Sequence, residues 1–317
     1  VEADRVGGVC LNVGCIPTKA LLWSAEVFHL VQQAGQFGVR TGPPEIDWPA
    51  MQARKAEVVN KLVGGVRMLL DRAGITVLAG RARFTNPHEV AIEGASGSQT
   101  LGASRYIVAT GSSPLQLPIP GANLPGVLDS TGALALERLP SSLLIVGGGA
   151  IGLEFATLFG TLGVKVTLVE MLPRLAPLMD ADIGEALRTA LAIQGVKVHT
   201  NTRIAALEEA PGGLRARLTC PQGDLTVEAE KVLLAAGRRP NVEGLGLDAA
   251  GVAFDRKGIR VDERMATSVP HIYAIGDATG GAMLAHVASH QGMVAAENAC
   301  GLQARMHYGA VPGCIFS

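Results

Sequence analysis

The spacing of apolar residues changes along the chain between the patterns of helices and those of strands. Residues 20–33 and 46–73 repeat apolar positions every three or four residues, which predicts two helices. Residues 75–80 resemble a short buried strand, and residues 82–100 alternate like antiparallel strands. An apolar strand at residues 106–111 ends at a glycine. This part of the chain is therefore predicted to be a mixed α/β unit.

A second unit follows residues 112–126, which are rich in Pro and Gly and are predicted to be a linker. In chain order its elements are a strand at 143–146, a glycine turn and helix at 147–163, a strand at 164–169, a helix at 182–195 and a strand at 196–199. This alternation implies a parallel, doubly wound sheet. Residues 203–230 look like an antiparallel excursion, and a strand at 232–237 closes the unit.

The two units resemble each other. Residues 106–111 and 232–237 are both apolar strands that close on an Ala-x-Gly sequence. A last strand at 272–277 leads into a helix predicted at 285–300. The expected fold is α/β, with two Rossmann-like dinucleotide-binding domains in three layers, each a parallel sheet with an antiparallel excursion.

Composition narrows the functional classes. A chain of 317 residues, 48% hydrophobic and 17% charged, can bury two cores. The formal net charge of -1 gives no support for nucleic-acid binding. There is no apolar run long enough to span a membrane and no visible signal peptide, so a cytoplasmic protein is expected. The chain opens on Val1 and stops at what reads as the start of a further strand, so a longer polypeptide is expected.

The strongest chemical signal is Cys10 and Cys15, separated by four residues in a glycine-containing segment. Two thiols at this spacing can close a small ring where a helix begins, and Pro17 favours a helix start there. A cysteine at a helix N-terminus has a lowered thiolate pKa, which suits redox chemistry. The alternatives are two buried structural cysteines or half of a zinc site, for which no second Cys or Cys/His pair is present.

The second signal is the glycine turn at residues 147–152, which follows a buried strand and opens a helix. Glu170 lies 18 positions after Gly152, at the end of the next strand. This is the context of the dinucleotide fingerprint, in which the helix N-terminus holds a pyrophosphate and the acid binds ribose hydroxyls. Because a carboxylate repels a 2′-phosphate, NAD is favoured over NADP.

For several single residues, the sequence allows two interpretations. Glu154 either compensates the dipole of its helix or pairs with Lys19. Glu2 either ends a strand at the surface or binds the ribose of a second dinucleotide. Asp277 either caps a turn or bonds a ribityl chain. His286 and His290 share a helix face, but no third ligand lies nearby, so no metal site is expected.

Five motifs occur in an order that resembles the pyridine nucleotide–disulfide oxidoreductases of class I, and in particular the dihydrolipoamide dehydrogenase type. They are GGVCLNVGCIPTKALL, YIVATGS, LLIVGGGAIGLEFA, VLLAAGRRPN and IYAIGDATGGAMLAHVA. The resemblance covers nearly the whole chain. Glutathione and mercuric reductases share the cysteine motif, but Glu170 with no basic cluster after it argues against the NADPH-using branch.

The resemblance implies roles for individual residues. Cys15 would contact the flavin and Cys10 would exchange with substrate, while Lys19, paired with Glu154, would lie near the flavin N5. The implied FAD-binding residues are Glu2, Gly8, Lys19, Arg81, Ala82, Thr110, Gly111, Asp277, Met283, Leu284, Ala285 and His286. The implied NAD-binding residues are Gly147, Gly149, Ile151, Gly152, Glu170 and Gly237.

The resemblance also implies the function. Protein-bound dihydrolipoamide would be oxidised to lipoamide and NAD reduced, with FAD and NAD as cofactors. The partners would be a lipoyl domain of a 2-oxoacid dehydrogenase complex or glycine cleavage system and a second copy in a homodimer. Residues 1–113 and 240–305 would bind FAD, residues 114–239 would bind NAD, and residues 306–317 would begin the interface domain.

Two parts of the family pattern are expected outside this sequence. They are a first glycine fingerprint before Glu2 and an interface domain after Ser317 that carries the catalytic base. Two alternative functions remain. One is a reductase for another disulfide or for mercuric ion, and the other is a non-catalytic nucleotide-binding protein.

Overall fold

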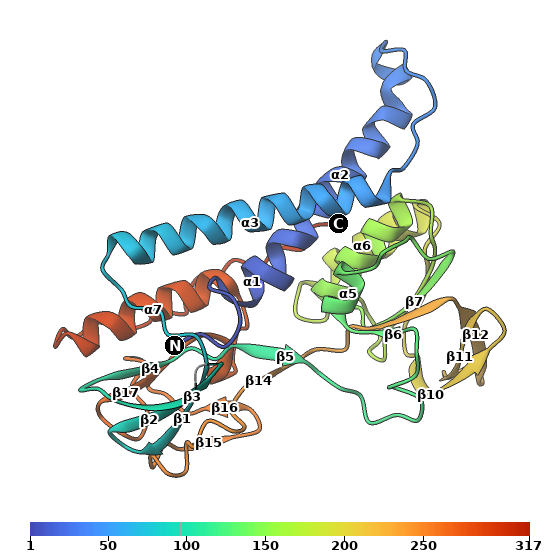
Figure 1. The fold of residues 1–317 in the computed structure, drawn as a ribbon. Coiled ribbons are helices and arrows are strands. Elements are labelled where there is room, and N and C mark those ends of the chain that lie inside the picture. The colour runs from blue at the N-terminus through green and yellow to red at the C-terminus, as the bar shows by residue number, and fades with distance from the viewer. Residues whose placement is uncertain (96) are drawn as a thin grey trace. The chain divides into compact units, whose positions relative to one another are not determined.

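The computed structural model describes residues 1–95 and 97–317 and contains two compact units (Figure 1). Unit 1 comprises Val1–Asn12, Leu62–Ser113 and Arg238–Pro312. Unit 2 comprises Val13–Lys61, Pro114–Gly237 and Gly313–Ser317. Each unit is therefore assembled from three separate stretches of sequence. The assignment of particular ranges to FAD and NAD stays a prediction.

Unit 2 is built on a five-stranded sheet in the order β6-β13-β7-β8-β9. The strands are β6 (Val127–Leu128), β7 (Ser142–Val146), β8 (Lys165–Val169), β9 (Lys197–His199) and β13 (Lys231–Leu234). Every pairing in this sheet is parallel. Helices α5 (Ala150–Thr161) and α6 (Ala181–Ile193) connect β7 to β8 and β8 to β9. The predicted parallel sheet is confirmed, but it is not doubly wound, because α5 and α6 share a single core.

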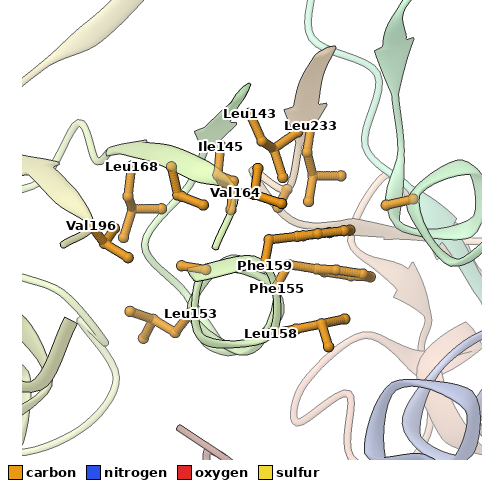
Figure 2. Close-up of a cluster of buried hydrophobic side chains, with 14 of the residues drawn as sticks. Leu143, Ile145, Leu153, Phe155, Leu158, Phe159, Val164, Leu168, Val196 and Leu233 are labelled. Atoms are coloured by element: carbon orange, nitrogen blue, oxygen red, sulfur yellow. The ribbon is translucent and has the colours of Figure 1, made fainter. Parts of the chain in front are cut away.

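One face of this sheet packs on α5. Leu143, Ile145 and Leu233 point from their strands toward the helix and are fully buried (Figure 2). Phe155 and Phe159 of α5 meet them with stacked rings, whose centroids are 6.0 Å apart. This apolar layer fixes α5 against the strands.

The opposite face packs on an antiparallel meander of β10 (Arg203–Ala210), β11 (Gly213–Thr219) and β12 (Leu225–Ala229). Leu144 and Val146, the residues that alternate with the helix-facing ones, belong to this second core. Successive side chains of a strand point to opposite faces, so strands buried on both faces are apolar throughout. Unit 2 therefore has three layers, with the sheet in the middle.

Two longer helices complete unit 2. Helix α2 (Cys15–Gln33) runs into a 3-10 turn, η1 (Ala34–Phe37), and α3 (Trp48–Arg72) begins in this unit. The Trp48 indole donates to the Leu136 carbonyl at 2.8 Å, and the Lys55 ammonium donates to the Leu134 carbonyl at 2.6 Å. Burial lowers the pKa of Lys55. These bonds hold the end of α4 (Ser130–Leu134), a short helix that the apolar spacing did not predict.

Unit 1 repeats this layering on a smaller scale. A meander of β1 (Arg81–Asn86), β2 (Glu89–Gly94) and β3 (Gly97–Gly102) precedes β4 (Tyr106–Val108), which pairs in parallel with β17 (Ile272–Ala274). The remaining elements are α1 (Gly8–Val13), η2 (Gly276–Thr279), α7 (Ala285–Ala299), the strand pair β5 (Ser112–Pro114) and β14 (Arg238–Pro240), and the pair β15 (Phe254–Asp255) and β16 (Gly258–Ile259).

The cores of unit 1 follow the same alternation. Ile272 and Ala274 of β17 share a core with Phe84 of the meander. Tyr273, between them, packs with Val287 of α7 on the other side. A meander, a parallel strand pair and a helix are thus stacked as in unit 2. The two units therefore share this layering, and the internal duplication suggested by the two strand motifs stays a prediction.

The strand predicted at residues 75–80 is wrong. Only Ala79 forms a bridge, parallel to Glu2, and Ile75 is 52% exposed. Glu2 donates its N–H to the Leu78 carbonyl and accepts from the Gly80 N–H, both at 2.9 Å. The segment is apolar enough for a strand, but Glu2 is its sole ladder partner among the described residues. Across the described chain, no helix combines the length and apolarity needed to cross a membrane.

The turn between β7 and α5 depends on close backbone approach. Gly147 has φ +117°, and a Cβ there would lie 2.4 Å from the Ala235 carbonyl oxygen. A Cβ on Gly152 would lie 1.9 Å from the Gly147 carbonyl oxygen. A Cβ on Gly149 would meet no atom within 4 Å. Two of the three glycines thus allow the helix to touch the strand ends, and the third leaves the turn open.

We expect Gly152→Ala to destabilise the protein by at least about 2 kcal/mol, because the added methyl overlaps the Gly147 carbonyl. Gly149→Ala is the matched control and should cost less than about 1 kcal/mol, the effect of alanine at an N-cap. Urea unfolding of both variants measures the difference. Equal stability of the two would show that the close approach at Gly152 does not restrict the turn.

Candidate functional site

Cys10 and Cys15 form a disulfide. Both are bonded, whereas Cys220, Cys300 and Cys314 are free thiols. Cys10 lies in α1 and Cys15 is the first residue of α2. The bond excludes the zinc-site alternative for this pair. No group of three or more His, Cys, Asp or Glu side chains in the described chain could hold a metal ion.

Helix α2 begins at Cys15, as the motif predicts. Gly14 is its N-cap with φ -136°, and no side chain caps the free N–H groups of the first turn. Thr18 bonds back to the Gly14 carbonyl through its hydroxyl at 2.7 Å. The dipole of this 19-residue helix favours a thiolate at its N-terminus. Cys15 is therefore the sulfur whose anionic form the helix stabilises.

Asn12 is a residue that the motif analysis overlooked. Its amide Nδ2 donates to the carbonyls of Gly8, Val6 and Arg5 at 3.0, 3.1 and 3.4 Å. These bonds tie the preceding loop to the helix that carries Cys10. An amide side chain between two cysteines, four positions after Gly8, was the available signal in the sequence.

Lys19 and Glu154 form the predicted ion pair within unit 2. The Lys19 ammonium lies 2.6 and 2.7 Å from the two Glu154 carboxylate oxygens. The side chain of Glu154 is 9% exposed and that of Lys19 is 31% exposed. The pair joins α2, one turn after Cys15, to α5, one turn after the glycine turn. Of the two interpretations of Glu154, the structure supports the pairing with Lys19 rather than compensation of the helix dipole alone.

Phe316 adds a third side to this pair. Its ring centroid lies 4.8 Å from the Lys19 ammonium, within cation–π range, and its backbone N–H lies 3.3 Å from a Glu154 carboxylate oxygen. The Ser317 and Thr157 hydroxyls lie 2.5 Å apart and fasten the segment to α5. Sequence reasoning gave this segment no role at the site.

The glycine turn has the features of an anion site. Gly149 is the N-cap of α5, has no side-chain capping bond and faces open space. Ile151 packs against the core beneath the turn, and Gly152 is buried. Free N–H groups at a helix N-terminus with no side chain in front of them suit a pyrophosphate. The residues present therefore fit the phosphate groups of NAD.

Glu170 lies at the end of β8 but is turned into the loop. It is 6% exposed, and its two oxygens accept from the Gly148 N–H at 2.6 Å and the Leu172 N–H at 2.7 Å. Each carboxylate oxygen retains a second lone pair that could accept from a ribose hydroxyl. The carboxylate thus braces the glycine turn, and its contact with NAD stays a prediction.

Glu2 repeats this arrangement in unit 1. It ends a strand-like segment, and its carboxylate accepts from the N–H two residues on, that of Asp4, at 2.9 Å. The segment that is bridged to Glu2 through Ala79 leads directly into β1. At the start of this strand, Arg81 is exposed and Ala82 is half-buried. The likeness of Glu2 to Glu170 is therefore structural as well as sequential.

The Ala-x-Gly strand ends lie at open turns. Thr110 and Gly111 follow β4, and Asn241 clamps them by accepting from the Thr110 hydroxyl at 2.7 Å. Gly111 and Gly237 have φ +69° and +130°, and a Cβ on either would meet nothing within 4 Å. Gly8, also at positive φ, is open in the same way. These three positions leave backbone accessible to a ligand.

Asp277 is the second residue of η2 and is half-buried. It accepts from the Ser112 hydroxyl at 2.5 Å through Oδ2. Met283 and Leu284 are half-buried and precede α7, whose N-cap Leu284 makes no side-chain capping bond, and Ala285 and His286 are exposed in the first turn. A carboxylate acceptor and free helix N–H groups in unit 1 suit a ribityl chain and a flavin carbonyl, so these residues fit FAD.

We expect an Ellman titration of the oxidised, denatured protein to count three thiols, and five after reduction. Cys10→Ser and Cys15→Ser should each raise the count before reduction to four, because each frees the partner sulfur. Cys220→Ser is the control and should lower it to two. A count of five in the untreated wild type would contradict the disulfide.

We expect the Lys19–Glu154 pair to contribute a coupling free energy of about 1–2 kcal/mol. Lys19→Met leaves a buried carboxylate without its cation, so it should destabilise the protein more than Lys19→Met combined with Glu154→Gln. A double-mutant cycle by urea unfolding measures this. Additive effects would show that the two groups do not interact in solution.

The sequence matches the family described as pyridine nucleotide-disulphide oxidoreductase over residues 1–292. It is 42% identical to a dihydrolipoyl dehydrogenase of Bacillus subtilis (strain 168) over 319 residues, covering 100% of this chain and 69% of the relative. It is 45% identical to the dihydrolipoyl dehydrogenase of Thermus scotoductus, again over 100% of this chain and 68% of the relative.

Solved structures of flavoprotein disulfide reductases and related proteins are also similar to this chain. LpdA of Mycobacterium tuberculosis has a TM-score of 0.91 at 30% identity, with 99% of this chain and 69% of that one covered. The Cu(II) complex of the HOCl-induced flavoprotein disulfide reductase RclA of Escherichia coli has a TM-score of 0.81 at 32% identity, with 94% and 64% covered. The chain thus spans about two thirds of the length of these relatives.

The dihydrolipoyl dehydrogenase relatives are NAD-dependent oxidoreductases that use FAD and NAD. This confirms, at the level of the family, the predicted enzyme class and cofactors. The disulfide, the two three-layer units and the glycine turn agree with the dinucleotide-binding fold of disulfide oxidoreductases. The chain belongs to the pyridine nucleotide-disulphide oxidoreductase family.

Proposed function

We propose that this chain contains the cofactor-binding part of a flavin-dependent dihydrolipoamide dehydrogenase. The observation that carries the proposal is the Cys10–Cys15 disulfide at the uncapped N-terminus of α2, in a chain whose relatives bear that name. The reaction oxidises protein-bound dihydrolipoamide to lipoamide and reduces NAD.

The disulfide takes part in the exchange with substrate. Dihydrolipoamide is a dithiol, and its oxidation to the cyclic disulfide releases two electrons and two protons. The Cys10–Cys15 bond accepts both electrons and one proton and becomes a Cys10 thiol and a Cys15 thiolate, and the second proton is released to solvent. Cys10 exchanges with the substrate sulfur, and Cys15 is held as a thiolate by the helix dipole. Bound FAD supplies the two-electron chemistry that connects the thiols to NAD.

The Lys19–Glu154 ion pair supplies a fixed charge near Cys15. Lys19 provides a fixed positive charge one helical turn from Cys15, and such a charge favours both the thiolate and the reduced flavin. Glu154 keeps the ammonium in place with two short bonds. We propose that Lys19 faces the flavin N5 and that the residues at Glu2, Gly8, Arg81, Ala82, Thr110, Gly111, Asp277 and 283–286 hold the rest of FAD.

NAD is the proposed nicotinamide cofactor. Gly149 and Gly237 leave backbone open to its phosphates, and Gly147 and Gly152 permit the close backbone approach that shapes the turn. The carboxylate of Glu170 would repel a 2′-phosphate. The proposed partners are a lipoyl domain of a 2-oxoacid dehydrogenase complex or glycine cleavage system and a second copy of the enzyme. The proposed location is the cytoplasm.

A second candidate is favoured by the likeness to RclA, a flavoprotein disulfide reductase whose structure is described as a Cu(II) complex. A reductase for another disulfide or for mercuric ion would use the same cysteine pair. A non-catalytic nucleotide-binding protein is the remaining alternative, and it would bind no flavin and be colourless.

We expect the complete protein to be yellow and to reduce NAD with dihydrolipoamide. Mild reduction should produce a long-wavelength charge-transfer band from the Cys15 thiolate. Cys15→Ser should abolish this band and lower the activity at least about 1000-fold. Cys10→Ser should also abolish the activity but retain the band. Absorption spectra and NADH formation measure both.

Cys220→Ser is the control and should change neither the spectrum nor the rate. Reduction of glutathione disulfide or mercuric ion without lipoamide turnover would overturn the substrate assignment. A colourless protein with normal stability would overturn the flavin-dependent function altogether.

A further inference from the structure

A directed chain of hydrogen bonds in unit 1 ends on Asp277. The Arg238 guanidinium donates through Nε to the Ser112 hydroxyl at 2.7 Å and through Nη2 to the Ser112 carbonyl at 2.6 Å. The Ser112 hydroxyl donates to Asp277 Oδ2 at 2.5 Å. All three residues belong to unit 1, where Ser112 lies in β5, Arg238 in the paired strand β14 and Asp277 in η2.

The direction of the chain follows from the donors available. A guanidinium has N–H donors and no acceptor, whereas a serine hydroxyl has a single proton. Because Arg238 Nε–H donates to the hydroxyl oxygen, the one proton of Ser112 is left for the Asp277 carboxylate. Ser112 is 2% exposed, so water does not compete for these bonds. The two bonds from Arg238 to a single serine also fix the plane of the guanidinium.

This chain of hydrogen bonds determines the orientation of the Asp277 carboxylate. Oδ2 is held by Ser112, and no hydrogen bond from another described residue reaches Oδ1. The backbone is held as well, because the Gly276 N–H donates to the Gln291 side chain at 2.7 Å. One oxygen is thus committed to the protein, and the other is available to a hydroxyl donor.

We propose that Arg238 is a positioning residue for FAD binding, which acts through Ser112 to hold the free oxygen of Asp277 toward the ribityl hydroxyls. This inference rests on the proposed flavin site at Asp277. Arg238 itself need not touch the cofactor. Its effect on FAD affinity should therefore depend entirely on the presence of the Asp277 carboxylate.

The test measures FAD affinity rather than turnover. Apoprotein prepared from the complete flavoprotein is titrated with FAD, and flavin fluorescence gives the dissociation constant. We expect Arg238→Ala to raise this constant about tenfold, the effect of losing one well-placed charged interaction. Arg239→Ala is the matched control, since Arg239 is its exposed neighbour and lies 3.5 Å from Glu243. It should stay within about twofold of the wild type.

A double variant separates positioning from an independent contact. Asp277→Ala alone should weaken FAD binding at least as much as Arg238→Ala. The variant with both changes should bind FAD as weakly as Asp277→Ala and no more weakly, because Arg238 has nothing left to position. Ser112→Ala removes the middle of the chain and should reproduce the Arg238→Ala effect. Thermal unfolding of each apoprotein checks that the variants fold, and Ser112→Ala replaces Arg238→Ala if the latter does not.

The outcomes distinguish the inference from the proposed function. If Asp277→Ala weakens FAD binding and Arg238→Ala and Ser112→Ala do not, the inference is wrong and the flavin site at Asp277 stands. Additive effects in the double variant also overturn it, because Arg238 would then act independently. If Asp277→Ala leaves the affinity unchanged, the proposed contact of Asp277 fails and the inference fails with it.

Discussion

The site in unit 2 depends on the approach of the α5 backbone to the end of β7, which is possible because Gly152 has no side chain. That contact places the open N-terminus of the helix at the sheet edge, where Gly149 leaves room for an anion. It also sets the rotation of α5, so that Glu154 points toward α2 while Phe155 and Phe159 point into the core. The anion site and the carboxylate of the ion pair are therefore consequences of one steric constraint.

The ion pair extends this constraint toward the disulfide. Lys19 lies one turn beyond Cys15 on α2, so its bonds to Glu154 fix the face of the helix that carries the sulfur. Phe316 closes the third side of the ammonium. Cys15 thus lies at a helix start, one turn from a partly buried charge pair.

The sequence predicted much of this arrangement, for identifiable reasons. Strands such as 143–146 are apolar on both faces, and helices such as 285–300 keep a regular spacing, so local patterns suffice for them. Local patterns also suffice for the cysteine and glycine motifs, which correctly predicted helix starts at Cys15 and Gly149. The pairing of Lys19 with Glu154 came from the family resemblance, since residues alone left it open between two readings.

What the sequence did not predict depends on partners far away in the chain. Residues 75–80 have strand composition but a ladder partner only at Glu2. Helix α4 is too short to show a period and begins at the Asp129 cap. Arg238 reads as one of two adjacent arginines, and nothing local distinguishes it from Arg239. Its partner Ser112 is 126 positions away, and only the fold brings the two together.

The parallel pair β4 and β17 has a consequence for how the protein is made. Unit 2 has all five strands of its sheet once Leu234 has been synthesised, whereas β4 in unit 1 waits for a partner that ends at Ala274. Folding on the ribosome is therefore out of sequence order. The sheet of unit 2 can form before the parallel pair of unit 1, in which β4 remains without its β17 partner until Ala274 has been synthesised.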